Sequence, residues 1–220
     1  MARNLNDFYQ FLEYVTRRRR AWFFVKNCLL FLFLCGVTFG ILNFPALSMQ
    51  LQYRVAPSTI ALPKRIHGSD FPIETHSQPR YPNNTLIVEK IGVQAPILWD
   101  STTENIEENL TQGVVHLAGS AYPGQKGNVF ITGHSSNFWW RKGDYNTVFA
   151  LLNNLAVGDE IVVVYQDKEF HYQVHRKLKV APGEIGQYTQ STDEPVLTLM
   201  TCWPIGTNWK RLIVQAKLVF

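Results

Sequence analysis

Three side chains in this sequence are of the types that act together on a carbonyl group. Cys202 ends the run LTLMTC, His134 lies in ITGHSS, and Arg211 lies in KRLIV. A thiol attacks an amide as its thiolate, an imidazole moves the proton, and a guanidinium stabilises the anion that forms. Taken singly, each residue also has an ordinary interpretation: an inert buried thiol, a histidine in a turn, and a solvated arginine. Their positions in the predicted elements therefore matter.

Alternation along the predicted strands places the three residues in comparable positions. Each lies at a strand end, in phase with the more polar face of its strand. The opposite face of the last strand is the expected core face, and it carries Leu212, Val214, Ala216 and Leu218. If the strands around 196 and 211 form a hairpin, the connection WPIGTNWK brings Cys202 and Arg211 together at its mouth.

An apolar segment near the N-terminus predicts a membrane span over residues 21–44. No charge occurs from Leu29 to Leu42, and the segment is long enough to cross about 30 Å of hydrocarbon at about 1.5 Å per residue. A cleaved signal peptide is the alternative, but the apolar run is long for a signal core and no clear small-x-small site follows. The cluster Arg17–Arg20 precedes the span. By the positive-inside rule, we expect residues 1–20 in the cytoplasm and 45–220 outside.

The predicted topology leaves one cysteine outside the membrane. Cys28 and Cys35 fall within the span, where the favoured interpretation is small apolar filler. Cys202 therefore has no partner for an intrachain disulfide, so it is either buried and inert or kept for its reactivity. The net charge of +4 comes largely from Arg17–Arg20. The remainder is near neutral, which argues against a basic nucleic-acid-binding face.

Composition divides the exterior part in two. Residues 45–84 are rich in proline and polar residues, which predicts an extended stalk; a segment that docks on the domain and shields a site is the alternative. Residues 85–220 contain seven or eight short β-rich runs with short helical stretches, such as TENIEENL at 103–110 and the helically spaced NTVFALLNNL at 146–155. The expected fold class is all-β, a barrel or a sandwich.

Several of these motifs, in order, resemble the sortase family. TLMTC, with an arginine nine residues later opening RLIV, resembles the sortase signature TLxTC with its downstream arginine. GNVFITGHSS resembles the stretch that carries the family's histidine. LIVEKIGVQAPIL and VFALLNNLAVGDEIVV resemble its opening strands and its segment of short helix, Gly-Asp turn and strand. The resemblance covers about 85–220 without interruption.

The resemblance implies a fold, an activity and three catalytic residues. Sortases are membrane-bound cysteine transpeptidases with an eight-stranded β-barrel. They cut an LPXTG-like sorting motif of a secreted protein through a thioester, then join the new carboxyl to an amine of the cell envelope or of a pilin. The family's nucleophile, histidine and arginine fall on Cys202, His134 and Arg211. No cofactor is implied.

Other residues have weaker claims to a site. Four near the three catalytic candidates are candidates for substrate contact, with plain packing as the alternative: Trp139, Trp140, Trp203 and Thr201. The loop before the cysteine strand, 181–195, corresponds to one that helps sortases select the sorting motif. Calcium occurs at acidic loops in some members, but a solvated face is the favoured interpretation of the candidates here: Glu104, Glu107, Glu108 and Asp144. No zinc-ligand spacing occurs.

Two other functions compete with the sortase interpretation. One is a non-enzymatic, membrane-anchored β-domain such as an adhesin or receptor, with an inert Cys202. The other is a different exterior cysteine peptidase or transpeptidase. An L,D-transpeptidase has its cysteine in an SxGCxR-like run, whereas here the arginine follows nine residues later. No C-terminal membrane helix and no clear aspartate-proline-aromatic plug are found, which favours an anchoring sortase like classes D or E over a pilin polymerase.

Overall fold

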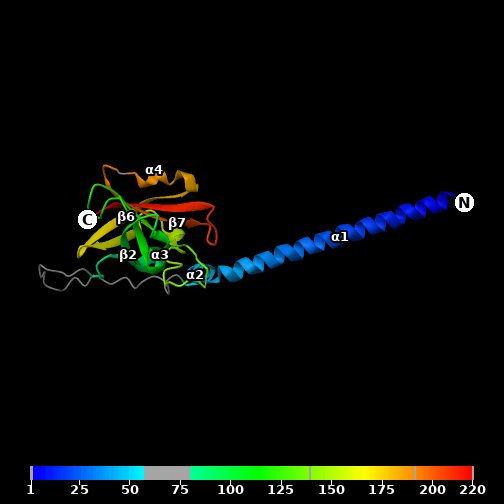
Figure 1. Cartoon of the computed structure of the whole chain (residues 1–220), viewed down its shortest axis with the longest axis horizontal. Helices are drawn as coiled ribbons and strands as arrows, with labels where there is room; N and C mark the ends of the chain where they lie inside the picture. Colours follow the sequence, from blue (N-terminus) through cyan, green and yellow to red (C-terminus); the bar gives the residue numbers. More distant parts are fainter. Residues whose placement is uncertain (1, 57–79, 139, 191, 220) are drawn as a thin grey trace. The chain divides into compact units, whose positions relative to one another are not determined.

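The computed structural model describes residues 2–56, 80–138, 140–190 and 192–219. The chain divides after Leu42 into two units, residues 1–42 and 43–220 (Figure 1). The first unit is the single helix α1, Ala2–Leu42. Its stretch Thr16–Leu42 contains an 18-residue window with a mean hydropathy of 2.0 and is long and apolar enough to cross a membrane. The span predicted at 21–44 overlaps this stretch.

Eight strands in the described residues close into a barrel, in the order β1-β2-β3-β4-β7-β8-β6-β5. Most neighbours are antiparallel, whereas β2–β3 and β4–β7 are parallel. The strands are β1 Thr85–Val88, β2 Val93–Ser101, β3 Val114–Leu117, β4 Gly127–Thr132, β5 Glu160–Tyr165, β6 Lys168–Val180, β7 Pro195–Trp203 and β8 Lys210–Leu218. The predicted all-β, eight-stranded barrel is confirmed.

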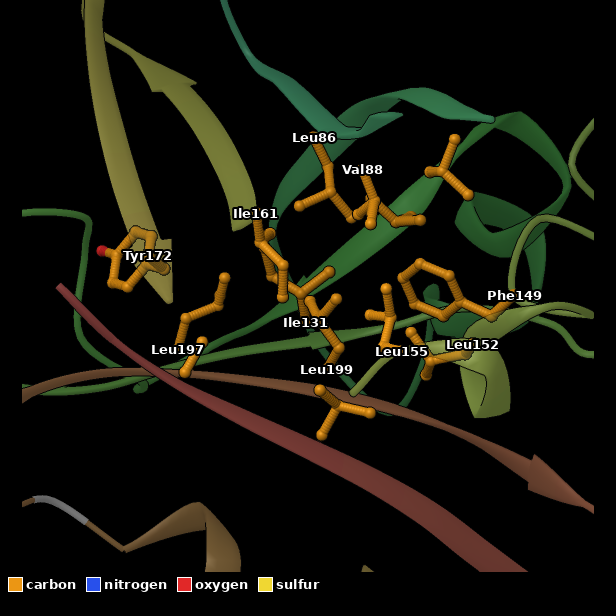
Figure 2. Close-up of a cluster of buried hydrophobic side chains, with 14 of the residues drawn as sticks. Leu86, Val88, Ile131, Phe149, Leu152, Leu155, Ile161, Tyr172, Leu197 and Leu199 are labelled. Atoms are coloured by element: carbon orange, nitrogen blue, oxygen red, sulfur yellow. The ribbon is translucent and has the colours of Figure 1, made fainter. Parts of the chain in front are cut away.

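Branched and aliphatic side chains fill the barrel interior, as expected of residues that favour strands. Figure 2 shows this core, to which Leu86, Ile131 and Leu197 contribute from three different strands. On β8 the core face carries Leu212, Val214 and Ala216, all buried, so the predicted strand phase is confirmed. Burying this much apolar surface is the main source of the barrel's stability.

The outer face of β7 is also covered, by the segment that leads into it. This segment contains the 3₁₀-helix η4, Pro182–Glu184, and the short helix α4, Gly186–Thr189, which lies on the side of β8 away from the core (Figures 1 and 2). Asn128 donates to the carbonyl of Tyr188. Thr198 Oγ1 donates to Asn128 Oδ1 at 2.7 Å and accepts from Gln215 Nε2 at 2.9 Å. A chain of hydrogen bonds thus fastens the loop 181–194 across three strands.

Two helical predictions have different outcomes. The stretch 103–110 leads into helix α3, Ile106–Gln112, as expected. The stretch 146–155, apolar at helical spacing, instead forms turns and the 3₁₀-helix η3, Leu152–Asn154. The amide of Phe149 donates to the carbonyl of His134 at 2.9 Å, so tertiary contacts replace helical hydrogen bonds here. A further 3₁₀-helix, η2, Glu89–Ile91, joins β1 to β2.

The extended stalk predicted from residue 45 is wrong for its first residues. Phe44–Val55 form helix α2, with Pro45 in its first turn, where a missing N–H breaks no helical hydrogen bond. Ala46 is buried against Ala150 and Ile205. The start of the segment therefore docks on the barrel, which was the alternative interpretation. Residues 57–79 of the predicted stalk lie outside the described residues.

Candidate functional site

Cys202 and Arg211 are register partners on adjacent antiparallel strands. Cys202 on β7 pairs with Arg211 on β8, and Thr201 pairs with Leu212. Partners of this kind have Cα atoms about 4.5–5.5 Å apart. The hairpin expected from the sequence is confirmed, and it brings the thiol and the guanidinium to the same end of the barrel.

His134 reaches the other flank of β7 because β4 runs parallel to it. Thr132 pairs with Met200, so continuing the register by two residues brings His134 alongside Cys202. Two hydrogen bonds carry the pairing past the end of β4. The Gly133 amide donates to Met200 O at 3.1 Å, and Thr201 Oγ1 donates to Gly133 O at 2.7 Å. The cysteine strand therefore lies between the chain segments of the histidine and the arginine.

Burial sets the protonation of His134. Its half-buried position lowers the pKa of the imidazole, because the charged form loses solvation. The negative charge of Glu107 raises this pKa, and the positive charge of Arg141 lowers it further. The neutral imidazole is favoured at neutral pH, as a group that must accept a proton from a thiol requires.

The Arg211 side chain is held by backbone carbonyls of the β7–β8 loop and of the first residue of β8. Its Nη1 donates to the carbonyl of Asn208 at 2.9 Å and to that of Lys210 at 3.2 Å. These bonds fix one end of a planar, permanently charged group beside the cysteine strand. A fixed guanidinium of this kind suits the recognition of a carbonyl oxygen that becomes negatively charged.

The four candidates for substrate contact occupy different environments. Thr201 is buried, and its hydroxyl ties β7 to Gly133. Trp203, half-buried beside the core, has the ammonium of Lys179 at 4.1 Å from its ring centroid. Trp140 is exposed and stacks on Phe138 with ring centroids 4.6 Å apart. Trp139 lies outside the described residues. Contact of these side chains with a substrate remains a prediction.

The acidic residues considered for calcium do not gather into a metal centre among the residues that the structure describes, where no group of three or more His, Cys, Asp or Glu side chains is placed to hold a metal ion. Glu107, on α3, instead acts on the charge of His134. This role could not be predicted from the sequence, because nothing in the spacing of Glu107 and His134 links α3 to the end of β4.

The loops around the site are joined by contacts that no sequence pattern predicts. Ser136 Oγ accepts from the Gly206 amide at 2.9 Å, which joins the segment after the histidine to the loop after the cysteine. Gly206 has φ 78°, and a Cβ at this position would lie 2.5 Å from Oδ1 of Asn43. Glycine is needed here both for its backbone conformation and for the close approach of the chain.

Comparison with known proteins points to one family. The sortase domain family model matches residues 86–219. The chain is 27% identical over 137 residues to sortase D of Bacillus subtilis (strain 168), covering 61% of this chain and 62% of that protein. It is 27% identical over 132 residues to sortase A of Bacillus anthracis, covering 60% and 57%. The chain thus spans less than two thirds of the length of these relatives.

Solved structures show the same fold. A sortase D5 transpeptidase of Clostridium perfringens matches with a TM-score of 0.51 and 31% identity, covering 62% of this chain and 78% of that one. Sortase C-1 of Actinomyces oris matches with a TM-score of 0.54 and 29% identity, covering 62% and 72%. Sortase C of C. perfringens, solved with the C-terminal cell wall sorting motif, matches with a TM-score of 0.52 and 26% identity, covering 62% and 69%.

Proposed function

This chain belongs to the sortase family, and from that premise we propose that it is a membrane-anchored cysteine transpeptidase of secreted proteins. Its proposed substrate carries an LPXTG-like sorting motif near its C-terminus, and the acceptor is an amine of the cell envelope or of a pilin. The similarity to a sortase C solved with a sorting motif supports a peptide substrate of this class. An adhesin and an L,D-transpeptidase lose support, because the sortase family model spans nearly the whole barrel.

One observation carries the proposal. Cys202 pairs in register with Arg211 on one side, and on the other its strand is hydrogen-bonded to the segment that carries His134. Three residues far apart in the sequence thus meet at one end of the barrel, and each has the chemistry that acyl transfer requires.

The proposed reaction has two acyl transfers. Neutral His134 takes the proton of the Cys202 thiol, and the sulfur attacks the scissile carbonyl. Arg211 stabilises the resulting oxyanion. The imidazolium then protonates the leaving amine, the C–N bond breaks, and a thioester remains on Cys202. The acceptor amine attacks the thioester, His134 accepts its proton, and the new amide leaves as the thiol is restored.

Topology follows from the anchor. The helical stretch Thr16–Leu42 supports a membrane span, and Arg17–Arg20 stand at its start. We place residues 1–20 in the cytoplasm and 45–220 outside, because positive charge is retained on the cytoplasmic side. A reporter fused after Phe220 should be active only outside the cytoplasm. Activity only in the cytoplasm would contradict this topology.

The activity is tested with a sorting-motif peptide and an amine acceptor. The full chain should cleave the peptide and form the new amide, and mass spectrometry should find the acyl group on Cys202. Cys202→Ala should abolish both reactions. A matched control, Cys28→Ala with Cys35→Ala, should keep them. Exchange by the Cys202→Ala protein would contradict the proposed nucleophile.

A further inference from the structure

Helix α2 has two opposite apolar faces. Ala46, Met49 and Tyr53 lie on the face that packs against the barrel. Phe44 and Leu51, seven positions apart, lie together on the opposite face and are 68% and 65% exposed. Val55, four positions further, is also exposed. A helix that rests on a protein core is expected to be polar on its outer side, so this outer face indicates a second apolar environment.

Two neighbouring loops carry further exposed apolar rings. Phe138 and Trp140 stack on each other in the segment after the catalytic histidine, and Trp209, 74% exposed, ends the β7–β8 loop. We call these rings and the outer residues of α2 the apolar rim, which consists of Phe44, Leu51, Val55, Phe138, Trp140 and Trp209. Among the described residues of the second unit, the other exposed large apolar side chains are Val157 and Val219.

The segments of the apolar rim are joined by contacts close to it. Ala46 of α2 packs on Ile205 of the β7–β8 loop, and the backbone of Gly206 lies against the side chain of Asn43. Ser136, two residues before Phe138, accepts the hydrogen bond from the Gly206 amide. Apolar side chains of this size concentrated on three connected segments of a surface mark an interaction site.

The chain itself indicates what covers the apolar rim. Helix α1, which supplies the proposed span, ends at Leu42, and Phe44 begins α2. Because consecutive Cα atoms are about 3.8 Å apart, the rim starts within two residues of the end of the span. No charged residue occurs between Lys26 and Arg54. A lipid surface is therefore always adjacent, and any protein partner would have to displace it.

The charges near the apolar rim fit a lipid surface with anionic headgroups. Within 43–56, 135–150 and 203–211 the carboxylate is Asp144, whereas the cationic residues are Arg54, Arg141, Lys142, Lys210 and Arg211. Tryptophan favours the membrane interface, because its ring is apolar and its N–H is polar. Juxtamembrane lysine and arginine are attracted to anionic lipids.

We propose that the apolar rim inserts into the headgroup region of an anionic phospholipid bilayer, with α2 lying between the barrel and the lipid. This surface goes beyond the proposed transpeptidase activity and rests on the proposed span. Trp209 is separated from Arg211 by one residue, and Phe138 is four residues from His134. The catalytic end of the barrel is consequently the end that faces the membrane, where a substrate still held by the membrane would arrive.

The test uses the full chain in nanodiscs of phosphatidylcholine and phosphatidylglycerol. In a protein with Cys28, Cys35 and Cys202 replaced by alanine, a single cysteine replaces Leu51 or Trp209 and carries a fluorophore. Val219 provides the matched control, since it is also exposed and apolar but lies at the other end of β8, roughly 33 Å from Trp209 at about 3.3 Å per residue. Quenching by a headgroup nitroxide reports contact with lipid, and quenching by iodide reports contact with water.

Nitroxide quenching at positions 51 and 209 should exceed that at 219 several-fold, and iodide quenching should show the opposite order. Pure phosphatidylcholine should weaken the nitroxide quenching; unchanged quenching would overturn the preference for anionic lipid.

Equal nitroxide quenching at all three positions would overturn the proposal. Iodide then identifies the alternative, because a solvated face is accessible to it and a face covered by protein is not. A chain that fails to enter nanodiscs would overturn both the span and this proposal, whereas the activity of the unaltered chain is measured separately.

Discussion

Cys202 lies directly opposite Arg211 in the antiparallel pair of β7 and β8. The guanidinium of Arg211 is therefore close to the cysteine strand, and its own hydrogen bonds determine how it can act. The Nη1 of Arg211 already donates to the carbonyls of Asn208 and Lys210, so the guanidinium is oriented before any substrate arrives. Orientation in advance of the reaction is what makes a donor effective toward an oxyanion.

Replacing Arg211 by lysine should therefore fail although the charge is retained. An ammonium cannot both bind the loop carbonyls and present a planar set of donors. We expect kcat/KM for peptide transfer to fall by about 10²–10³, the usual cost of losing one oxyanion donor, and Arg211→Ala to be at least as poor. Steady-state kinetics measure this, with circular dichroism as a control for folding. A near-normal rate for Arg211→Lys would contradict the role.

The charges around His134 should move the pH profile in opposite directions. In the proposed mechanism the neutral imidazole is the active form, so activity falls as pH drops through its pKa. Burial lowers this pKa, Glu107 raises it, and Arg141 lowers it. Glu107→Gln should therefore shift the acid limb of kcat/KM to lower pH, and Arg141→Gln should shift it to higher pH. Shifts in the same direction for both variants would contradict this assignment.

The hydroxyl of Thr201 should support the geometry of the site. It donates to the carbonyl of Gly133, next to the histidine. Thr201→Val leaves this carbonyl without that donor and should lower the free energy of unfolding by about 1 kcal/mol. Thr201→Ser keeps the hydroxyl and should retain most of the stability and rate. Urea unfolding and kinetics test this. Equal behaviour of the two variants would show that the hydrogen bond contributes little.

Acid should destabilise the barrel through His116. This side chain is fully buried, with Nε2 at 2.8 Å from Ser120 Oγ and 3.0 Å from Ala121 O. Burial lowers its pKa, opposed by the hydrogen bond to Ala121 and the charge of Asp100. Below a pH of about 6.5 the unfolded chain binds a proton that the folded chain does not, so stability falls from there down to the folded-state pKa.

Urea unfolding at several pH values measures this effect. His116→Phe retains an aromatic ring between Trp99 and Tyr122, which lie 4.9 Å and 5.1 Å from the imidazole. Whatever its absolute stability, this variant should lose less stability than the parent chain between pH 7.5 and 5. An identical pH dependence in the two proteins would show that other groups are responsible.

Local patterns in the sequence were sufficient for the strands and for the pairing of Cys202 with Arg211. Period-two alternation is set by the backbone and appears directly in the residues, and a hairpin joins strands that are close in sequence. The position of His134 beside Cys202 could not be predicted from such local patterns. It depends on a parallel pairing of β4 with β7, which are separated by two strands in the chain, and it was expected only from the resemblance to sortases.

Helix α2 and the influence of Glu107 on His134 could not be predicted either, because both depend on contacts between residues far apart in the sequence. The prolines after residue 44 suggest an extended chain, whereas Pro45 lies in the first turn of a helix that docks through Ala46 on Ala150 and Ile205. The stretch 146–155 shows the reverse error: its helical spacing is real, but burial and the contact of Phe149 with His134 favour turns. In each case a long-range contact overrides a local preference.

Closure of the barrel limits how a peptide can be recognised. In the part of the chain that the structure describes, each of the eight strands is paired on both sides. No strand is therefore left with a free edge along its whole length, which disfavours binding of a sorting peptide by β-augmentation. The sorting peptide must instead be recognised by the side chains and loops at the catalytic end of the barrel, including the loop 181–194. Motif specificity is thus separable from the scaffold, and exchanging that loop between sortases should transfer specificity while leaving the hydrogen-bonded barrel intact.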